Sequence, residues 1–211
     1  NKQAYRQREE IDMQAESELE KRPYRSMELV TYEDFRKFIA EKKIVTIEDI
    51  EVKIGNQWEI KEYAPPKDYV LENQTVWSFP NRGNWATHAG NYRGNWSPYI
   101  PRNLILKYTN PNETVLDQMV GSGTTLVECK LLGRNAIGVD INRDAIMVTL
   151  DRLTFSYNPL DANYPKNLKT ETYVGDARNL DKIDDNSIDL IATHPPYAGI
   201  ITYSNNRVEG D

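Results

Sequence analysis

Three aspartates, Asp117, Asp140 and Asp176, each stand within two residues of the end of a short β-prone run in the second half of the sequence. In a parallel sheet the carboxyl ends of neighbouring strands meet at one edge, and ligands bind beyond that edge. Three carboxylates there could accept hydrogen bonds from a polar ligand. Asp140 follows Gly123 by about seventeen residues, which is suitable for accepting two hydrogen bonds from a ribose diol. Asp176 is a candidate for an adenine amino group.

A glycine-rich turn follows the first of these aspartates in the run Asp117-Gln-Met-Val-Gly-Ser-Gly-Thr-Thr, which ends at Thr125. A strand that leads through such a turn into a helix directs backbone amides and a helix N-terminus at one point. Gly121 and Gly123 lack a Cβ and would let the main chain approach a ligand closely. A glycine turn alone is also typical of nicotinamide and flavin proteins, and the spacing to Asp140 narrows the prediction to an adenosine cofactor.

The run His194-Pro195-Pro196-Tyr197 follows the fourth β-prone run. The two prolines restrict the backbone, so that carbonyl groups point in fixed directions, and Tyr197 offers a flat ring. An exocyclic amine on a base is a poor nucleophile, because its lone pair is delocalised into the ring. Two acceptors around the nitrogen would localise that lone pair and direct it at the methyl group of a sulfonium donor. A rigid turn without chemistry is the alternative interpretation.

The elements that must position these residues alternate between strand and helix. This alternation predicts an α/β fold, a Rossmann-like, doubly wound and mainly parallel sheet. The expected strands are residues 114–116, 136–139, 172–174 and 187–192, and the expected helices are residues 124–132 and 142–155. Cys129 lies in an apolar helical pattern and is expected in the core.

The first seventy residues predict a small N-terminal helical module and linker. Thr31 and Asp34 form a capping pair before the apolar pattern of a first helix, and Thr46 and Asp49 repeat it before a second helix that would stop at Gly55. Packing is the default role for the module, with a dimer contact or a DNA contact as alternatives. Residues 1–70 and 71–211 are the two expected domains.

Composition excludes several classes of protein. Hydrophobic residues make up 39% and charged residues 27% of the 211 residues, as in ordinary globular proteins. No apolar run is long enough to span a membrane, and a cytoplasmic location is expected. The Cys and His residues lack metal-ligand spacing, so no metal is expected. The formal charge of −6 disfavours a generic nucleic-acid binder, and the basic residues between 82 and 107 are either a local basic face or scattered solvated charges.

The order of these motifs resembles the amino-methylating DNA methyltransferases, over roughly residues 75–205. The resemblance implies S-adenosyl-L-methionine as cofactor, double-stranded DNA as partner, and methylation of adenine N6 or cytosine N4 in a flipped-out base. It implies catalytic roles for His194, Pro195, Pro196 and Tyr197. The cofactor-binding residues implied by the motifs and the preceding aromatic segment are Asp117, Met119, Gly121, Gly123, Thr124, Thr125, Asp140, Ile141, Asp176, Ala177, Trp85, Tyr92 and Pro98.

The sequence departs from the family pattern in two respects. His194 stands where the family has Asn, Asp or Ser, and only a neutral imidazole can accept a hydrogen bond, so activity is expected to fall below about pH 6.5. The family's sheet also continues for about three strands after the tetrad. An incomplete sheet is therefore expected, with the rest and the target recognition on a C-terminal remainder or a second chain.

Two alternative functions fit the same motifs. The acceptor could be RNA or a protein glutamine, whose amide nitrogen also has a delocalised lone pair. The chain could instead be a non-catalytic methyltransferase-like subunit, in which the unusual residue His194 marks lost chemistry.

Overall fold

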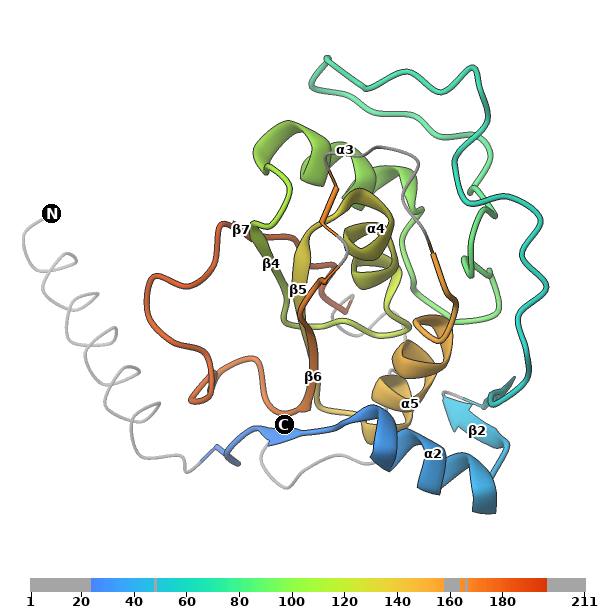
Figure 1. Ribbon diagram of the computed structural model, residues 1–211, viewed down its shortest axis with the longest axis vertical. Coiled ribbons are helices and arrows are strands. Elements are labelled where there is room, and N and C mark those ends of the chain that lie inside the picture. The colour runs from blue at the N-terminus through green and yellow to red at the C-terminus, as the bar shows by residue number, and fades with distance from the viewer. Residues whose placement is uncertain (1–23, 48, 158–163, 166, 197–211) are drawn as a thin grey trace, which may run out of the picture.

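The computed structural model describes residues 24–47, 49–157, 164–165 and 167–196, and its centre is a five-stranded sheet (Figure 1). The strand order is β1-β6-β5-β4-β7. The strands are β1 (Glu28–Leu29), β4 (Thr114–Asp117), β5 (Asn135–Asp140), β6 (Thr170–Val174) and β7 (Leu190–Ile191). The last of these is shorter than the sequence predicted.

Parallel pairing brings the strand ends together. β4 pairs in parallel with β5 and β7, and β5 pairs in parallel with β6, whereas β1 is antiparallel to β6. Asp117 lies opposite Gly138, and Asp140 lies opposite Val174. The expected mainly parallel α/β fold is confirmed, and its carboxyl ends form one edge.

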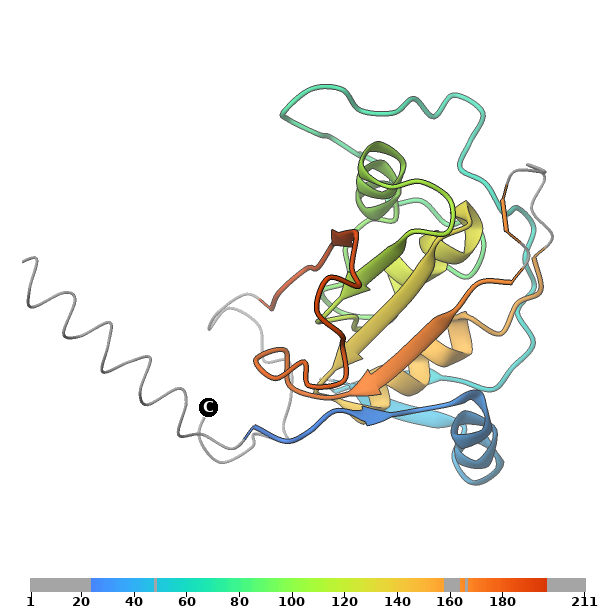
Figure 2. The same cartoon turned by 60° about the vertical axis from the view of Figure 1, so that its left-hand side comes forward.

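Helices cover one face of this sheet. The helices α4 (Thr124–Leu132) and α5 (Arg143–Arg152) pack there, with α3 (Tyr99–Tyr108) against α4 (Figures 1 and 2). The main core, which includes the fully buried Cys129, lies between these helices and the sheet. A smaller cluster on the other face joins Leu116, Val139 and Tyr173 to apolar residues of the segment 176–189. That segment connects β6 to β7 without a helix.

Helix α4 begins and ends at glycine. Gly123 has φ 82° and Gly133 has φ 75°, in the left-handed region that glycine adopts without strain. Almost every residue of α4 is buried, as expected for a helix enclosed between a sheet and two other helices. Asn142 caps the N-terminus of helix α5, since its side chain accepts a hydrogen bond from the amide of Asp144.

The predicted first N-terminal helix is confirmed as α2 (Tyr32–Glu41), with a complete capping box. The side chain of Thr31 accepts from the amide of Asp34, and that of Asp34 accepts from the amide of Thr31. These residues belong to the same core as the sheet, since Phe35 is 2% exposed and clusters with core residues from α4 and α5. Figure 2 shows β1 beside β6, and α2 contacts α5.

The predicted second N-terminal helix is wrong. The segment instead holds two antiparallel strands, β2 (Ile44–Ile47) and β3 (Ile50–Lys53). The segment is rich in β-branched residues, which lose side-chain freedom in a helix and pack well in strands. Asp49, which precedes β3, adopts φ 62°, a conformation that aspartate tolerates. Gly55, the expected helix stop, has φ 76° and donates its amide to Asp151.

An irregular segment, residues 54–98, runs from β3 to α3, a helix that the sequence analysis did not predict. Two rings of this segment, Phe79 and Tyr69, stack on Tyr99 in the first turn of α3. Asn103 of α3 is fully buried, and its side-chain oxygen accepts a hydrogen bond from the amide of Glu72. None of the helices in the described residues is both long and apolar enough to cross a membrane.

The shared core predicts the effect of truncating Phe35. We expect Phe35→Ala to lower the free energy of unfolding by about 3–5 kcal/mol, because the ring is buried and its removal leaves a cavity. Phe38→Ala is the control, because Phe38 is only partly buried. Urea titration followed by circular dichroism and tryptophan fluorescence measures both. The predicted domain boundary at residue 70 implies instead that the N-terminal residues fold independently. Separate unfolding transitions for the two probes would support that alternative. So would a loss of unfolding free energy in Phe35→Ala that is no larger than in Phe38→Ala.

Candidate active site

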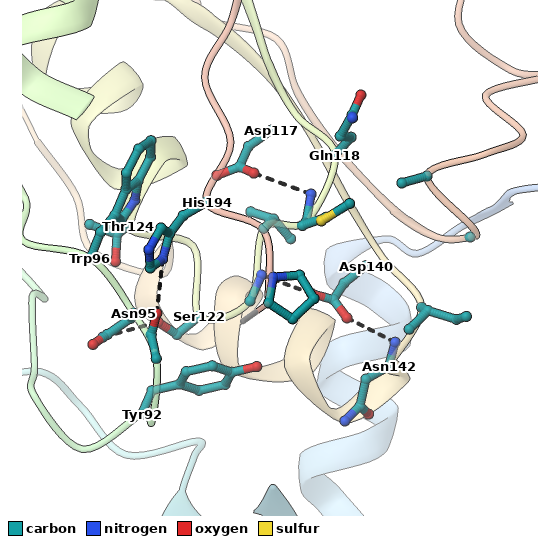
Figure 3. A pocket seen from close by; sticks show the side chains of 18 of the residues that line it. Tyr92, Asn95, Trp96, Asp117, Gln118, Ser122, Thr124, Asp140, Asn142 and His194 are labelled. Atoms are coloured by element: carbon teal, nitrogen blue, oxygen red, sulfur yellow. Dashed lines mark hydrogen bonds between the residues drawn. The ribbon is translucent and has the colours of Figure 1, made fainter. Parts of the chain in front are cut away.

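A cavity of about 350 Å³ opens at the carboxyl ends of β4, β5 and β6 (Figure 3). The three aspartates predicted to meet there, Asp117, Asp140 and Asp176, all line it, and so does His194. The remaining lining residues come from the irregular segment, the glycine turn and the strand ends. They are Tyr92, Arg93, Gly94, Asn95, Trp96, Gln118, Met119, Val120, Gly121, Ser122, Thr124, Ile141, Asn142, Gly175, Ala177, Arg178 and Pro196.

The glycine turn is tied to the neighbouring strand and helix. The Gly121 amide donates to Asp140 Oδ2 at 2.9 Å, and its carbonyl accepts from Thr149 of α5 at 2.9 Å. Gly121 lines the cavity, as predicted, whereas Gly123 does not. A Cβ on Gly123 would lie 2.9 Å from the Thr149 side chain, so this glycine allows the turn to pack against α5 rather than a ligand to approach.

Asp140 keeps accepting capacity toward the cavity. Its Oδ2 accepts from Gly121 and its Oδ1 from the Asn142 amide, both at 2.9 Å. A carboxylate has about four acceptor sites, so two remain for a ligand. Burial raises the pKa of Asp140, and the two amide hydrogen bonds oppose that shift.

Asp117 is the most deeply buried of the three aspartates, at 2% exposed. Its Oδ1 accepts from the Met119 amide at 3.2 Å, and its Oδ2 accepts from the Thr125 hydroxyl. Burial raises the pKa of Asp117 to about 6, although these hydrogen bonds favour the charged form. Thr125 is fully buried and does not line the cavity, so it acts through Asp117.

Asp176 is paired with an arginine. Arg178 donates through Nε and Nη2 to its two carboxylate oxygens, and the Arg178 amide also donates to Oδ1. These hydrogen bonds lower the pKa of Asp176. The pair occupies most of the accepting capacity that the sequence analysis assigned to an adenine amino group. The neighbouring Ala177 lines the cavity, as does Ile141, whose side chain is 49% exposed.

His194 is held between the end of β7 and the irregular segment. Its Nδ1 lies 3.0 Å from the carbonyl oxygen of Gly94, and its ring stacks on Trp96 with centroids 5.6 Å apart and planes 8° from parallel. Since a carbonyl oxygen only accepts, Nδ1 carries the proton. Pro196 lines the cavity and Pro195 does not. The predicted Tyr197 lies outside the described residues.

Of the three residues predicted to close over the cofactor from the irregular segment, only Tyr92 lines the cavity. Trp85 is buried in the core, where its Nε1 donates to Glu128 at 2.7 Å, and Pro98 precedes α3. Trp85 and Pro98 differ from their predicted place for a physical reason. An aromatic pattern in the sequence identifies rings that are buried or stacked, but not the surface on which they pack.

The sequence analysis missed Asn95, Trp96, Ser122 and Asn142 as cavity residues. Ser122 lies inside the predicted glycine turn and Asn142 follows the predicted Asp140, so proximity to a motif was a usable signal for both. Asn95 and Trp96 lie between the predicted residues Tyr92 and Pro98, so the aromatic segment gave a similar signal for them. In the described part of the chain, no three His, Cys, Asp or Glu side chains are grouped so that they could hold a metal ion.

Comparisons with known proteins identify the family of the chain. The model of a family described as DNA methylase matches residues 6–150. The chain is 32% identical over 108 residues to the DNA adenine methyltransferase YhdJ of Escherichia coli, covering 49% of this chain and 37% of that protein. It is 42% identical over 59 residues to the Type II methyltransferase M.HpaI of Haemophilus parainfluenzae, and the alignment covers 28% of this chain and 19% of that protein. It is 42% identical over 67 residues to the Type II methyltransferase M1.MboII of Moraxella bovis, and the alignment covers 30% of this chain and 24% of that protein.

These alignments span about a fifth to somewhat over a third of the length of the three relatives. The family match covers well over half of this chain, and the fold and the motif order agree with it. The chain therefore belongs to the amino-methylating DNA methyltransferases.

Proposed function

We propose that this chain carries the cofactor-binding and catalytic part of an S-adenosylmethionine-dependent enzyme that methylates the exocyclic amino group of adenine or cytosine in DNA. One observation carries the proposal. The strand-end aspartates and His194 line the same cavity, although nearly eighty residues separate Asp117 from His194 in the sequence. A donor and an acceptor of a methyl group could thus meet there.

The residues fit an adenosine cofactor by their chemistry. Asp140 retains two acceptor positions for a ribose diol, and Ile141 and Ala177 offer apolar surface for a flat ring. The acidic Asp117 favours the cationic methionine end. The volume of about 350 Å³ lies within the range of small-molecule sites. When bound, the cofactor supplies a methyl group activated by a positively charged sulfur.

His194 is suited to orient the acceptor amine. Because its Nδ1 hydrogen donates to the Gly94 carbonyl, the neutral ring carries its lone pair on Nε2. That nitrogen and a backbone carbonyl of the tetrad would accept the two amino hydrogens and leave the nitrogen lone pair directed at the methyl group. Stacking on Trp96 limits rotation of the His194 ring. The base would have to leave the duplex to reach this position.

Double-stranded DNA and further polypeptide are the proposed partners. β7 is an edge strand of the described sheet, and its Ile191 is 57% exposed. An exposed edge strand is a template for pairing. We infer that further strands, from a longer form of this polypeptide or from a second chain, extend the sheet at β7 and contribute target recognition.

Removal of the Asp140 carboxylate tests the cofactor site. We expect Asp140→Ala to weaken binding of S-adenosylhomocysteine about 10- to 100-fold in calorimetry, because hydrogen bonds to a charged acceptor contribute about 1.5–3 kcal/mol. Asp144→Ala is the matched control, since Asp144 lies nearby in the first turn of α5 but does not line the cavity. Equal affinities of Asp140→Ala and Asp144→Ala would remove the support for an adenosine site.

The raised pKa of Asp117 predicts proton release on cofactor binding. A cationic ligand stabilises the carboxylate and lowers its pKa from about 6, so binding near pH 6 should release up to about half a proton from this group, and less at pH 8. The affinity for the cofactor should therefore fall as the pH drops below 6, because Asp117 is then increasingly protonated. Calorimetry in two buffers of different ionisation enthalpy measures the release. Asp117→Asn should reduce it, and a buffer-independent heat at pH 6 in the unmodified protein would contradict the role of Asp117.

The reaction is tested by supplying methyl-labelled S-adenosylmethionine with duplex DNA, RNA or protein, followed by mass spectrometry of the product nucleosides and amino acids. We expect label only in DNA, as N6-methyladenine or N4-methylcytosine. His194→Leu should reduce kcat about 10²- to 10³-fold with little change in cofactor affinity, because one hydrogen-bonding group to the amine is lost. His194→Asn keeps an acceptor and should lose far less activity. Activity that appears only in His194→Asn would instead identify a non-catalytic subunit.

A further inference from the structure

Another cavity, of about 460 Å³, lies where the N-terminal residues meet the end of α5. Its walls come from α2, from the first part of the irregular segment and from residues 151–156, and α2 contacts α5 there (Figure 1). Among the described residues, none lines both this cavity and the cavity at the strand ends. The volume is within the range of sites for small organic molecules.

Asp151, in the last turn of α5, supplies the only charged side chain among the described residues that line this cavity. The residue is 3% exposed. Its Oδ1 accepts from the Gly55 amide at 2.7 Å, and its Oδ2 accepts from Trp58 Nε1 at 3.1 Å. A carboxylate has about four acceptor positions, so two remain for a ligand.

The hydrogen-bond donors to this carboxylate are neutral. Among the ion pairs of the described residues, none includes Asp151. The guanidinium of the next residue, Arg152, donates instead to Ser122 Oγ at 2.7 Å and to Asn91 Oδ1 at 3.0 Å. Burial raises the pKa of Asp151, while its two hydrogen bonds and the charge of Arg152 oppose that shift. A buried carboxylate held by neutral donors favours a cation beside it.

Aromatic rings form much of the remaining wall, from Phe35, Trp58, Tyr63 and Phe155. The Tyr63 and Phe155 rings lie with their centroids 5.9 Å apart. The face of an aromatic ring attracts a cation within about 6 Å, and its apolar surface also suits methylene groups. Lys130 already makes such a contact, since its Nζ lies 4.3 Å from the Phe155 centroid, although Lys130 does not line the cavity.

We propose that this cavity binds an alkylammonium ion, whose charged head pairs with Asp151 and whose methylene chain lies against the rings of Trp58 and Tyr63. A bare metal ion fits less well, because the described residues hold no group of three His, Cys, Asp or Glu side chains that could ligate it. A free alkylamine and a lysine side chain both present an ammonium group on a four-carbon chain, so either source offers the required chemistry.

Two probes that differ only in the head group, butylammonium and butanol, test the charge preference. The full chain is labelled with ¹⁵N, and the indole resonance of Trp58, identified by its loss in Trp58→Phe, is followed by NMR at constant ionic strength. We expect a saturable shift with butylammonium, at a dissociation constant of about 1–10 mM, and binding of butanol at least about 10-fold weaker.

A third probe, Nα-acetyl-lysine amide, distinguishes the two sources of the ammonium group. Its side chain is the same four-carbon ammonium, attached to a peptide backbone. Binding of this probe as well as butylammonium supports a lysine of a polypeptide as the occupant. Binding of butylammonium alone supports a free alkylamine, because the cavity then excludes the backbone.

Asp151→Asn removes the charge and keeps the size of the side chain. We expect it to weaken butylammonium at least about 10-fold and butanol less than about 3-fold, because an ion pair is lost. The Asp151 carbonyl continues to accept from Trp58 Nε1, which keeps the ring in place. Asp144→Asn is the matched control, since Asp144 is also in α5 but does not line this cavity, and it should change neither affinity.

Tyr63 tests the aromatic wall independently of Asp151, and it decides the proposal if thermal unfolding shows that Asp151→Asn is not folded. The side chain is 37% exposed, so its replacement is expected to leave the fold intact. Tyr63→Leu should weaken butylammonium about 2- to 5-fold more than butanol, whereas Tyr63→Phe keeps the ring and should retain the affinity.

The inference is overturned if neither ammonium probe gives a saturable shift of Trp58, or if butylammonium and butanol bind equally. An unchanged affinity for butylammonium in folded Asp151→Asn overturns it as well. These outcomes leave the proposed methyl transfer untouched, because that reaction is assigned to the cavity at the strand ends.

Discussion

The hydrogen bond from the Gly121 amide to Asp140 joins the ends of two strands, and the geometry of the cavity depends on it. It holds the turn after β4 against the carboxylate that ends β5. Thr149 of α5 holds the Gly121 carbonyl from the other side, and Gly123 allows the close contact with Thr149. Because the turn is restrained at both its amide and its carbonyl, the N-terminus of α4 faces the cavity in one orientation.

The irregular segment that covers the cavity is anchored by a second buried group, Glu128 of α4. Its Oε1 accepts from Trp85 Nε1 and lies 2.7 Å from His88 Nε2, and its Oε2 accepts from Arg102 of α3 at 2.8 Å. Burial lowers the pKa of His88, which favours the neutral ring. These bonds attach residues 85–88 and α3 to the same helix that begins at the glycine turn. Tyr92 and Trp96 lie between these two attachment points in the sequence, so the bonds to Glu128 restrain the segment that carries them on both sides.

Charged groups of both signs lie in and behind the wall of the cavity. The strand ends contribute carboxylates, and the buried guanidinium of Arg152 lies behind the turn. The burial that makes these groups costly also strengthens their effect on a ligand, since little water screens them.

The sequence by itself determined the parallel α/β core, helix α4, the capping box of α2 and the meeting of the strand-end aspartates. Each of these depends on local spacing, because strand period, helix caps and glycine turns are encoded over a few residues. It did not determine the pairing of β2 with β3, helix α3, or the burial of Trp85 away from the cavity. Nor did it indicate that Arg178 pairs with Asp176, or that Arg152 reaches Ser122 from thirty residues away. Those features depend on contacts between distant segments, and only the tertiary structure decides which surface a ring or a charged side chain meets.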